Sequence, residues 1–317
     1  MINGTQVAAK FPNQHVTVCK TSAYRFISEL IRANLFWRVT SEALPLFMRA
    51  GDAISTTPLT TGQYEPQIKG FIEICSSSGF NRFMLDIGAN IGLISCQTGK
   101  LFDTVMLFEP NELCANILRT NAAVSLDRQK YEIFNYGLGA KDEVLTLRVP
   151  KNNWGGAYVV SSQNSYSDVV LAKKDGFDHF DPANYLQMNV RIHAADQEFQ
   201  RIFEKLRQEQ RLVGVIKIDV EGLEMVLLDA LARTVPPEFA LAVVFENWGD
   251  PAKLEEMLAR FHGRATLYSI VKTPRGRSSN VGKLLQLLMA KEQRFTLQPW
   301  EPADCSYDMA MFVAAQT

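Results

Sequence analysis

One stretch, Phe83–Ser95 (FMLDIGANIGLIS), restricts the fold of this chain more than any other. It begins with an apolar run typical of a buried parallel strand, and Asp86 stands near the strand's end. Small or turn-forming residues come next: Gly88, Ala89, Asn90 and Gly92. Apolar residues from Ile91 onward then indicate a helix. A strand, a tight turn and a helix in this order predict a nucleotide-type binding corner in a doubly wound α/β sheet.

The residue at position 90 argues against a dinucleotide in this corner. The G-x-G-x-x-G fingerprint places a second glycine two residues after the first, so that a pyrophosphate can approach the backbone. Here Asn90 takes that place after Gly88. The Asp86 carboxylate would also repel a phosphate, whereas it would attract a cation. S-adenosylmethionine carries an ammonium and a sulfonium, so these residues favour it over NAD.

A second acidic residue, Glu109, ends the next predicted strand, Val105–Phe108. It lies 21 residues after Gly88, a spacing at which an acidic side chain can accept hydrogen bonds from ribose hydroxyls. Both NAD and S-adenosylmethionine contain a ribose. Glu109 therefore supports a nucleotide cofactor without distinguishing between the two.

Three motifs together resemble the FkbM-type S-adenosylmethionine-dependent methyltransferases. They are DIGANIG at 86–92, FEPN at 108–111 and KIDVEGLE at 217–224. The upstream segment GQYEP at 62–66 is also similar to the segment that precedes the fold in that family. The resemblance implies a class I, Rossmann-like sheet of seven mostly parallel strands. It further implies methyl transfer to a hydroxyl of a sugar, a glycan or glycolipid, or a secondary metabolite.

The predicted cofactor-binding residues surround the ends of the first three predicted strands. They are Asp86, Gly88, Ala89, Asn90, Gly92, Glu109, Pro110, Asn111, Gly137 and Leu138. The last two follow the predicted strand Tyr131–Tyr136. In this fold class that segment lies against the adenine, and a simple turn is the alternative.

Acidic residues also end the later predicted strands. A hydroxyl is a weak nucleophile, so a base that removes its proton helps methyl transfer. Asp219, Glu221 and Glu246 are the candidates, and Lys217 would steady the Asp219 carboxylate from the same face of its strand. Two structural alternatives stay open, because Glu221 would also suit a helix cap and Lys217 an ion pair. The three acids suit Mg²⁺ as well, but no ligand pattern supports a metal site.

A long irregular stretch, at about residues 150–186, interrupts the alternation of strands and helices. Loops of this length inside a compact domain are usually functional or disordered. Its first residues resemble an Asn/Gly-rich stretch of the family, and we predict Asn153 and Trp154, together with Tyr64, as substrate-binding residues. Its aromatic residues would form either a platform for a ring or a cluster that holds the loop down. They are Trp154, Tyr158, Tyr166, Phe177 and Tyr185.

The segments outside the motifs suggest two parts. Residues 1–60 are predicted to be an N-terminal helical extension, with Ser55–Thr61 as a linker or loop because it is rich in Ser and Thr and contains Pro58. Residues 61–317 would form the methyltransferase domain, with an antiparallel last strand. The extension would pack on the domain, mediate a homodimer or contact the substrate.

Charge and composition restrict the partners. The net charge of −1 and the pI near 6.5 give no support for nucleic-acid binding, and no apolar run approaches the ~18 residues of a membrane span. Five cysteines without C-x-x-C spacing and the lack of a signal-peptide pattern predict a reduced, cytoplasmic protein. A small-molecule or glycan acceptor is the expected partner. An NAD-type oxidoreductase and a non-catalytic cofactor-binding protein are the alternatives.

Overall fold

The computed structural model describes residues 44–162, 164, 173, 176, 178–247, 251–272, 295–301 and 307–316. Most of the predicted N-terminal extension, residues 1–43, lies outside the described residues, as do Tyr166 and Phe177. The division of the chain at residue 60 therefore stays a prediction.

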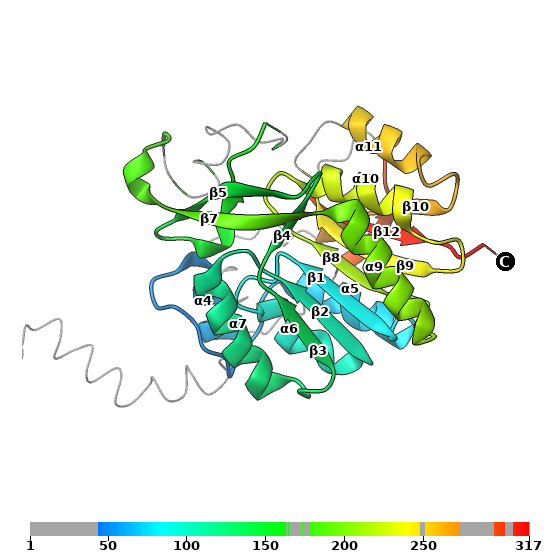
Figure 1. The fold of residues 1–317 in the computed structure, drawn as a ribbon. Helices are drawn as coiled ribbons and strands as arrows, with labels where there is room; N and C mark the ends of the chain where they lie inside the picture. The colour runs from blue at the N-terminus through cyan, green and yellow to red at the C-terminus, as the bar shows by residue number, and fades with distance from the viewer. Residues whose placement is uncertain are drawn as a thin grey trace, which may run out of the picture.

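The main sheet of the described structure has eight strands in the order β11-β10-β12-β9-β8-β1-β2-β3 (Figure 1). In chain order the strands are β1 (Phe83–Ile87), β2 (Thr104–Phe108), β3 (Tyr131–Phe134), β8 (Val213–Ile218), β9 (Ala240–Glu246), β10 (Ala265–Lys272), β11 (Phe295–Pro299) and β12 (Asp308–Val313). Strands β3, β2, β1, β8 and β9 are parallel, and β12 is antiparallel to both of its neighbours. The predicted mostly parallel α/β sheet with an antiparallel last strand is confirmed.

The number of strands differs from the prediction of seven. The additional strand, β11, pairs antiparallel with β10 at the edge of the sheet. Four of its five residues are exposed. Its sequence, FTLQP, alternates over only two apolar residues, which is too short a pattern to predict a strand.

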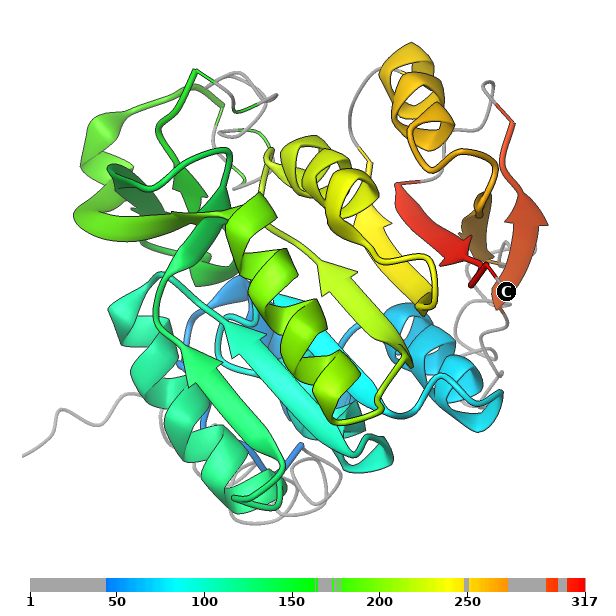
Figure 2. The ribbon, with the colours of Figure 1, turned by 45° about the vertical axis from the view of Figure 1, so that its right-hand side comes forward.

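Helices cover both faces of the sheet (Figure 2). One face carries α5 (Pro66–Ser77), α6 (Leu93–Thr98) and α7 (Glu112–Ser125), and the other carries α9 (Ala195–Gln208), α10 (Glu224–Thr234) and α11 (Pro251–Ala259). Successive side chains of a strand point to opposite faces. In β1, Phe83 and Leu85 pack with α9 and α10, while Met84 packs with α5 and α6. The sheet is thus doubly wound, as predicted.

A second, smaller sheet stands beside the main one (Figure 1). It contains β4 (Gly137–Gly139), β5 (Glu143–Pro150), β6 (Tyr158–Val159) and β7 (Tyr185–Ala194), in the order β4-β7-β5-β6. Residues 137–139, for which a simple turn was the alternative to an adenine contact, form a short strand parallel to β7. The adenine contact stays a prediction. Between β5 and β7 the described residues include β6 and two 3-10 turns, Trp154–Gly156 and Pro182–Asn184.

The predicted linker at Ser55–Thr61 is wrong, because these residues belong to helix α4 (Ala53–Thr61). The Asp52 side chain caps this helix by accepting from the Ile54 amide, and Pro58 lies inside it. Tertiary contacts of α4 thus outweigh the low helix propensity of a Ser/Thr-rich segment with a proline. None of the described helices has the length and apolarity needed to cross a membrane.

Candidate functional site

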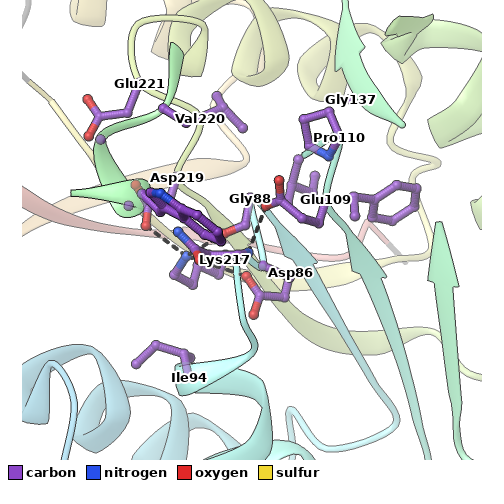
Figure 3. Close-up of a pocket in the computed structure, with 18 of the residues that line it drawn as sticks. Asp86, Gly88, Ile94, Glu109, Pro110, Gly137, Lys217, Asp219, Val220 and Glu221 are labelled. Atoms are coloured by element: carbon purple, nitrogen blue, oxygen red, sulfur yellow. Dashed lines mark hydrogen bonds and ion pairs between the residues drawn. The ribbon is translucent and has the colours of Figure 1, made fainter. Parts of the chain in front are cut away.

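A cavity opens where the parallel strands β1, β2 and β8 end (Figure 3). One side of it is formed by the loop after β1 and the end of β2, and another by the residues that follow β8. The second sheet contributes an apolar wall with Leu147, Val159 and Ile192. Ligands of open α/β sheets bind at this edge, so the topology places the cavity where a cofactor is expected.

Backbone hydrogen bonds fix the loop after β1 to the end of β2. The amides of Gly88 and Ala89 donate to the Phe108 carbonyl over 3.0 and 2.9 Å. The Asn90 amide donates to Glu109 Oε2 over 2.8 Å, and the Asn111 amide donates to Oε1 over 2.7 Å. Both Glu109 oxygens therefore hold the corner together, and each keeps a further lone pair for a ligand.

The Glu109 carboxyl has a raised pKa. Its burial raises the pKa to about 7, although the amides of Asn111 and Asn90 favour the charged form. The nearby Asp86 carboxylate adds to the increase, and Lys217 opposes it. The charge on Glu109 consequently changes near neutral pH in the ligand-free protein.

Gly88 is required for a different reason from the expected one. The sequence suggested that it lets a ligand approach the backbone, yet a Cβ at this position would lie 1.8 Å from the Asp219 carbonyl oxygen. Its φ of +84° also favours glycine. A Cβ on Gly92 would meet Leu118 of α7 at 2.7 Å. Both glycines therefore leave room for other parts of the chain, namely the Asp219 carbonyl and the Leu118 side chain.

Lys217 lies between two of the predicted site carboxylates (Figure 3). Its Nζ is 2.9 Å from Asp219 Oδ2 and 3.4 Å from Asp86 Oδ1, and the side chain is buried. Burial alone would lower the Lys217 pKa, but the carboxylates of Asp219 and Asp86 outweigh it and raise the pKa above its usual value. Glu65 acts in the same direction. The predicted ion pair between Lys217 and Asp219 is present.

Asp86 is 1% exposed and accepts a hydrogen bond from the Ser95 hydroxyl through Oδ2. Its second oxygen, Oδ1, makes no hydrogen bond with the described residues and has only the 3.4 Å ion pair with Lys217. Buried carboxylate oxygens are normally satisfied. This oxygen, at the cavity wall, therefore can accept a hydrogen bond from a ligand donor such as an ammonium.

Glu65 is a site residue that our sequence analysis missed. It lines the cavity beside Tyr64, and its carboxylate, after burial, raises the pKa of the Tyr64 hydroxyl. Burial and the charge of Asp219 raise the Glu65 pKa to about 8, and Lys217 opposes the increase. Glu65 also has a φ of +41°, which is uncommon outside glycine. The GQYEP motif was the available signal, but only the folded chain brings Glu65 to Lys217.

The residues after β8 form a tight turn. Glu221 has a φ of +47°, and its carbonyl accepts a 3.0 Å hydrogen bond from the Asn164 side chain of the irregular stretch. Glu224 accepts from the Gly222 amide over 2.9 Å and so ties this turn to the start of α10. The helix cap considered for Glu221 is not formed, because α10 begins at Glu224, has Leu223 at its N-cap and has no side-chain cap hydrogen bond.

Most of the predicted site residues come together in this cavity. All of the predicted catalytic and substrate residues line it, namely Asp219, Glu221, Glu246, Lys217, Asn153, Trp154 and Tyr64. The cofactor candidates that line it are Asp86, Gly88, Ala89, Asn90, Glu109, Pro110, Gly137 and Leu138. Gly92 and Asn111 are absent from the lining, because Gly92 precedes α6 and the buried Asn111 caps α7. The chemical role of each residue stays a prediction.

The aromatic residues of the irregular stretch divide between the two expected roles. Trp154 lines the cavity. Tyr158 and Tyr185 pack edge to face at 6.0 Å, and Phe180 lies against Tyr185 at 5.3 Å. These three form a separate cluster that holds the segment down. Within the described ranges, no group of three or more His, Cys, Asp or Glu side chains is placed to hold a metal ion.

Comparisons with known proteins give one sequence relative. No family model matches the chain. Over 174 residues it is 24% identical to a curated protein named methyltransferase sdnD of Sordaria araneosa, a match that covers 53% of this chain and 67% of that protein. The FkbM-type resemblance therefore stays a prediction.

Solved structures give distant likenesses. An O-methyltransferase from Bacillus cereus in complex with SAH is 11% identical, with a TM-score of 0.38 over 98% of this chain and 96% of that chain. A precorrin-6Y C5,15-methyltransferase from Geobacter metallireducens is also 11% identical, with a TM-score of 0.37 over 78% and 88% of the two chains. The strand order described above, and not these scores, defines the fold class of this chain.

Proposed function

We propose that this chain is an S-adenosylmethionine-dependent methyltransferase of the FkbM type. The sequence relative that is named a methyltransferase supports this proposal, as do the three motifs at 86–92, 108–111 and 217–224. The observation that carries it is the pair of buried carboxylates, Asp86 and Glu109, at the ends of adjacent strands β1 and β2. They stand on either side of the loop where a cofactor is expected.

The two carboxylates suit the two polar parts of this cofactor. Asp86 has a buried oxygen without a hydrogen bond that would accept from the α-ammonium. Glu109 has lone pairs for the ribose hydroxyls beyond those that bind Asn90 and Asn111. Two apolar residues of the second sheet that line the cavity, Leu138 and Ile192, would face the adenine. When bound, the cofactor supplies a methyl group on an electrophilic sulfonium.

We further propose a hydroxyl acceptor on a sugar, a glycan or glycolipid, or a secondary metabolite. Methyl transfer requires the hydroxyl oxygen in line with the methyl carbon at about 3–3.5 Å. Asp219 is the favoured base, because Lys217 fixes its carboxylate at the cavity wall. Glu221 and Glu246 line the same cavity and are the alternatives. Asn153, Trp154 and Tyr64 would contact the acceptor.

The proposal is tested by titration calorimetry with S-adenosylhomocysteine. We expect micromolar binding to the wild type and at least tenfold weaker binding to Asp86→Asn, which keeps the size of the side chain but removes its charge. Asp103→Asn is the matched control, because Asp103 directly precedes β2 at the opposite edge of the sheet, where it pairs with Arg82. It should bind like the wild type.

Lack of binding by the folded wild type would overturn the proposal. NAD would then be the next ligand to titrate, since an oxidoreductase is the main alternative. Binding of S-adenosylhomocysteine without methyl transfer to any hydroxyl acceptor in a screen with labelled S-adenosylmethionine would instead overturn the assignment of the acceptor class.

A further inference from the structure

A strap formed by residues 44–61 joins parts of the cavity that are distant in sequence. Leu44, Leu46, Met48 and Ile54 of the strap pack against the cluster of Ile91, Leu93 and Cys114. This cluster belongs to the loop after β1 and to helices α6 and α7. The loop after β1 and the first residues of α6 and α7 are called the cofactor corner below. The strap is thus attached to the cofactor corner by apolar contacts.

Asn121 of α7 gives this attachment a polar anchor. Its Oδ1 accepts from the Phe47 amide over 2.7 Å, and its Nδ2 donates to the Phe47 carbonyl over 3.0 Å and to the Ile91 carbonyl over 2.8 Å. The side chain is fully buried. The strap and the loop after β1 therefore share one hydrogen-bonding residue.

The other end of the strap binds the 3-10 turn that follows β5. Asp52 is 2% exposed, and its two oxygens have different partners. Oδ1 accepts from the Ile54 amide over 3.3 Å and so caps α4. Oδ2 accepts from the Trp154 amide over 3.2 Å and from Arg49 Nη1 over 3.0 Å. One carboxylate thus links the helix cap, the turn and a guanidinium.

Arg49 reinforces the link to the turn. Its Nη2 donates to the Lys151 carbonyl over 2.8 Å, and its guanidinium lies 4.6 Å from the centroid of the Trp154 ring. The Ala53 amide donates to the Asn152 carbonyl over 3.1 Å. Residues 151–154 are consequently bound to the strap through both backbone and side chain.

The turn is also packed closely against the strap. A Cβ on Gly155 would lie 2.5 Å from Ile54 Cγ2, 3.3 Å from Asn153 Oδ1 and 3.7 Å from the Asn90 side-chain nitrogen. Ile54, Asn153, Trp154 and Gly155 all line the cavity. The Trp154 indole N–H is buried without a hydrogen-bond partner among the described residues, so it has a donor left for a bound ligand.

We propose that Asp52 is a positioning residue for the site. Acting through the Trp154 amide and Arg49, it holds residues 151–156 against the cofactor corner and so forms one wall of the cavity. This inference rests on the proposed function, because it assumes that the cavity holds the cofactor. The carboxylate has no place among the reacting atoms, since it is buried between the strap and the turn.

The substitution Asp52→Asn separates the two duties of this side chain. Asparagine is as good a helix cap as aspartate, so the cap of α4 is retained. Its amide has only one acceptor oxygen, however, and cannot also serve the Trp154 amide and Arg49. Asp127→Asn is the matched control, because Asp127 also accepts from a backbone amide two residues ahead, that of Gln129, but is exposed and lies outside the cavity lining.

Two measurements on the full chain test the proposal. The first is amide hydrogen exchange of residues 151–156 by mass spectrometry, with β1 and β8 as internal references. The second is titration of S-adenosylhomocysteine. For Asp52→Asn we expect exchange of 151–156 to increase at least tenfold, exchange of β1 and β8 to stay unchanged, and binding to weaken at least fivefold. Asp127→Asn should match the wild type in both.

The emission of Trp154 gives a spectroscopic signature that global destabilisation does not mimic. The chain has four tryptophans, so each spectrum is compared with that of the same protein carrying Trp154→Phe. The Trp154 contribution should shift in Asp52→Asn, because Arg49 no longer has its carboxylate partner. The shift should be the same in Arg49→Lys, which keeps the charge but loses the planar guanidinium.

The outcomes separate this inference from the proposed function. If the folded wild type does not bind S-adenosylhomocysteine, the proposed function fails and the inference fails with it. If the wild type binds and Asp52→Asn either binds equally well or shows unchanged exchange at 151–156, only the positioning role is overturned.

Discussion

The Lys217 ammonium lies 2.9 Å from the Asp219 carboxylate and 3.4 Å from that of Asp86. Register pairing places Lys217 of β8 beside Asp86 of β1, so the contact follows from the strand order. Among the charged residues of the described segments that line the cavity, Lys217 is the one cation. It therefore compensates the charge of several acids at once.

Replacement of Lys217 by methionine is predicted to destabilise the fold. The change leaves buried carboxylates without a counter-charge, which costs about 3–5 kcal/mol when one partner of a buried pair is removed. Urea unfolding at pH 7 measures the loss. Lys205→Met is the control, because Lys205 pairs with Glu132 at the surface, where an ion pair contributes at most about 1 kcal/mol. Equal losses in both variants would contradict the prediction.

The raised pKa of Lys217 also predicts how the stability of the fold changes at alkaline pH. Its pKa is raised in the folded protein, so the folded state holds the proton more tightly than the unfolded state does. The stability from this ammonium is complete below pH about 10.4, the value of the unfolded side chain, and is lost as the pH rises beyond it. The difference in the free energy of unfolding between the wild type and Lys217→Met should therefore become smaller as the pH rises above about 10.4.

Glu109→Gln is predicted to weaken S-adenosylhomocysteine binding at least tenfold, or about 1.4 kcal/mol. The amide has one acceptor oxygen in place of two, and both Glu109 oxygens bind backbone amides in the native corner. Because the Glu109 pKa is about 7, wild-type affinity should also fall between pH 8 and pH 6. Calorimetry at several pH values measures both effects. Glu112→Gln, at an exposed position of α7, should change neither.

Glu65→Gln is predicted to make the ligand-free protein more resistant to alkaline pH. The Glu65 pKa is raised to about 8, so the folded state binds this proton more tightly than the unfolded state, whose pKa is about 4.3. Wild-type stability therefore declines between these two values as the pH rises. Urea unfolding should show similar stabilities at pH 4 and a more stable variant at pH 9. A pH-independent difference, like that expected for the exposed Glu255→Gln, would refute this.

Two glycine substitutions are predicted to act in opposite directions. Gly88→Ala places a Cβ 1.8 Å from the Asp219 carbonyl oxygen at a φ of +84°, and should cost at least about 2 kcal/mol. Gly70→Ala, inside α5, meets nothing within 4 Å and should stabilise by about 0.4–1 kcal/mol. Thermal unfolding compares the two. A Gly88→Ala protein as stable as Gly70→Ala would show that the corner can move.

Local patterns were sufficient to predict the centre of this fold. The apolar run at Phe83, the glycines after it and the acid at Glu109 all act over a few residues, and they predicted β1, its turn and the end of β2. The helix of the strap and the strand β11 were missed because no local pattern in the sequence indicates them. Pro58 lies in a helix that is stabilised by contacts with distant segments, and β11 exposes most of its side chains.

The sequence predicted which residues belong to the site better than it predicted which of them contact one another. Asp86, Glu109 and Asp219 were found from strand ends, and the structure brings them to one cavity. That Gly88 admits the backbone of Asp219 depends on the adjacency of β1 and β8. Glu65 comes near Lys217 because it directly precedes α5, which contacts β8. No spacing in the sequence encodes either relationship.

The shared bonding of Asn121 has a consequence for how the protein responds to its ligand. Because one side chain holds both Phe47 of the strap and Ile91 of the cofactor corner, the order of these two segments is thermodynamically coupled. A ligand that favours the ordered corner therefore also favours the ordered strap, and a ligand that binds the ordered strap has the reciprocal effect on the first ligand's affinity. A partner that binds and stabilises the strap would therefore increase the affinity of the cavity for its ligand without contacting that ligand.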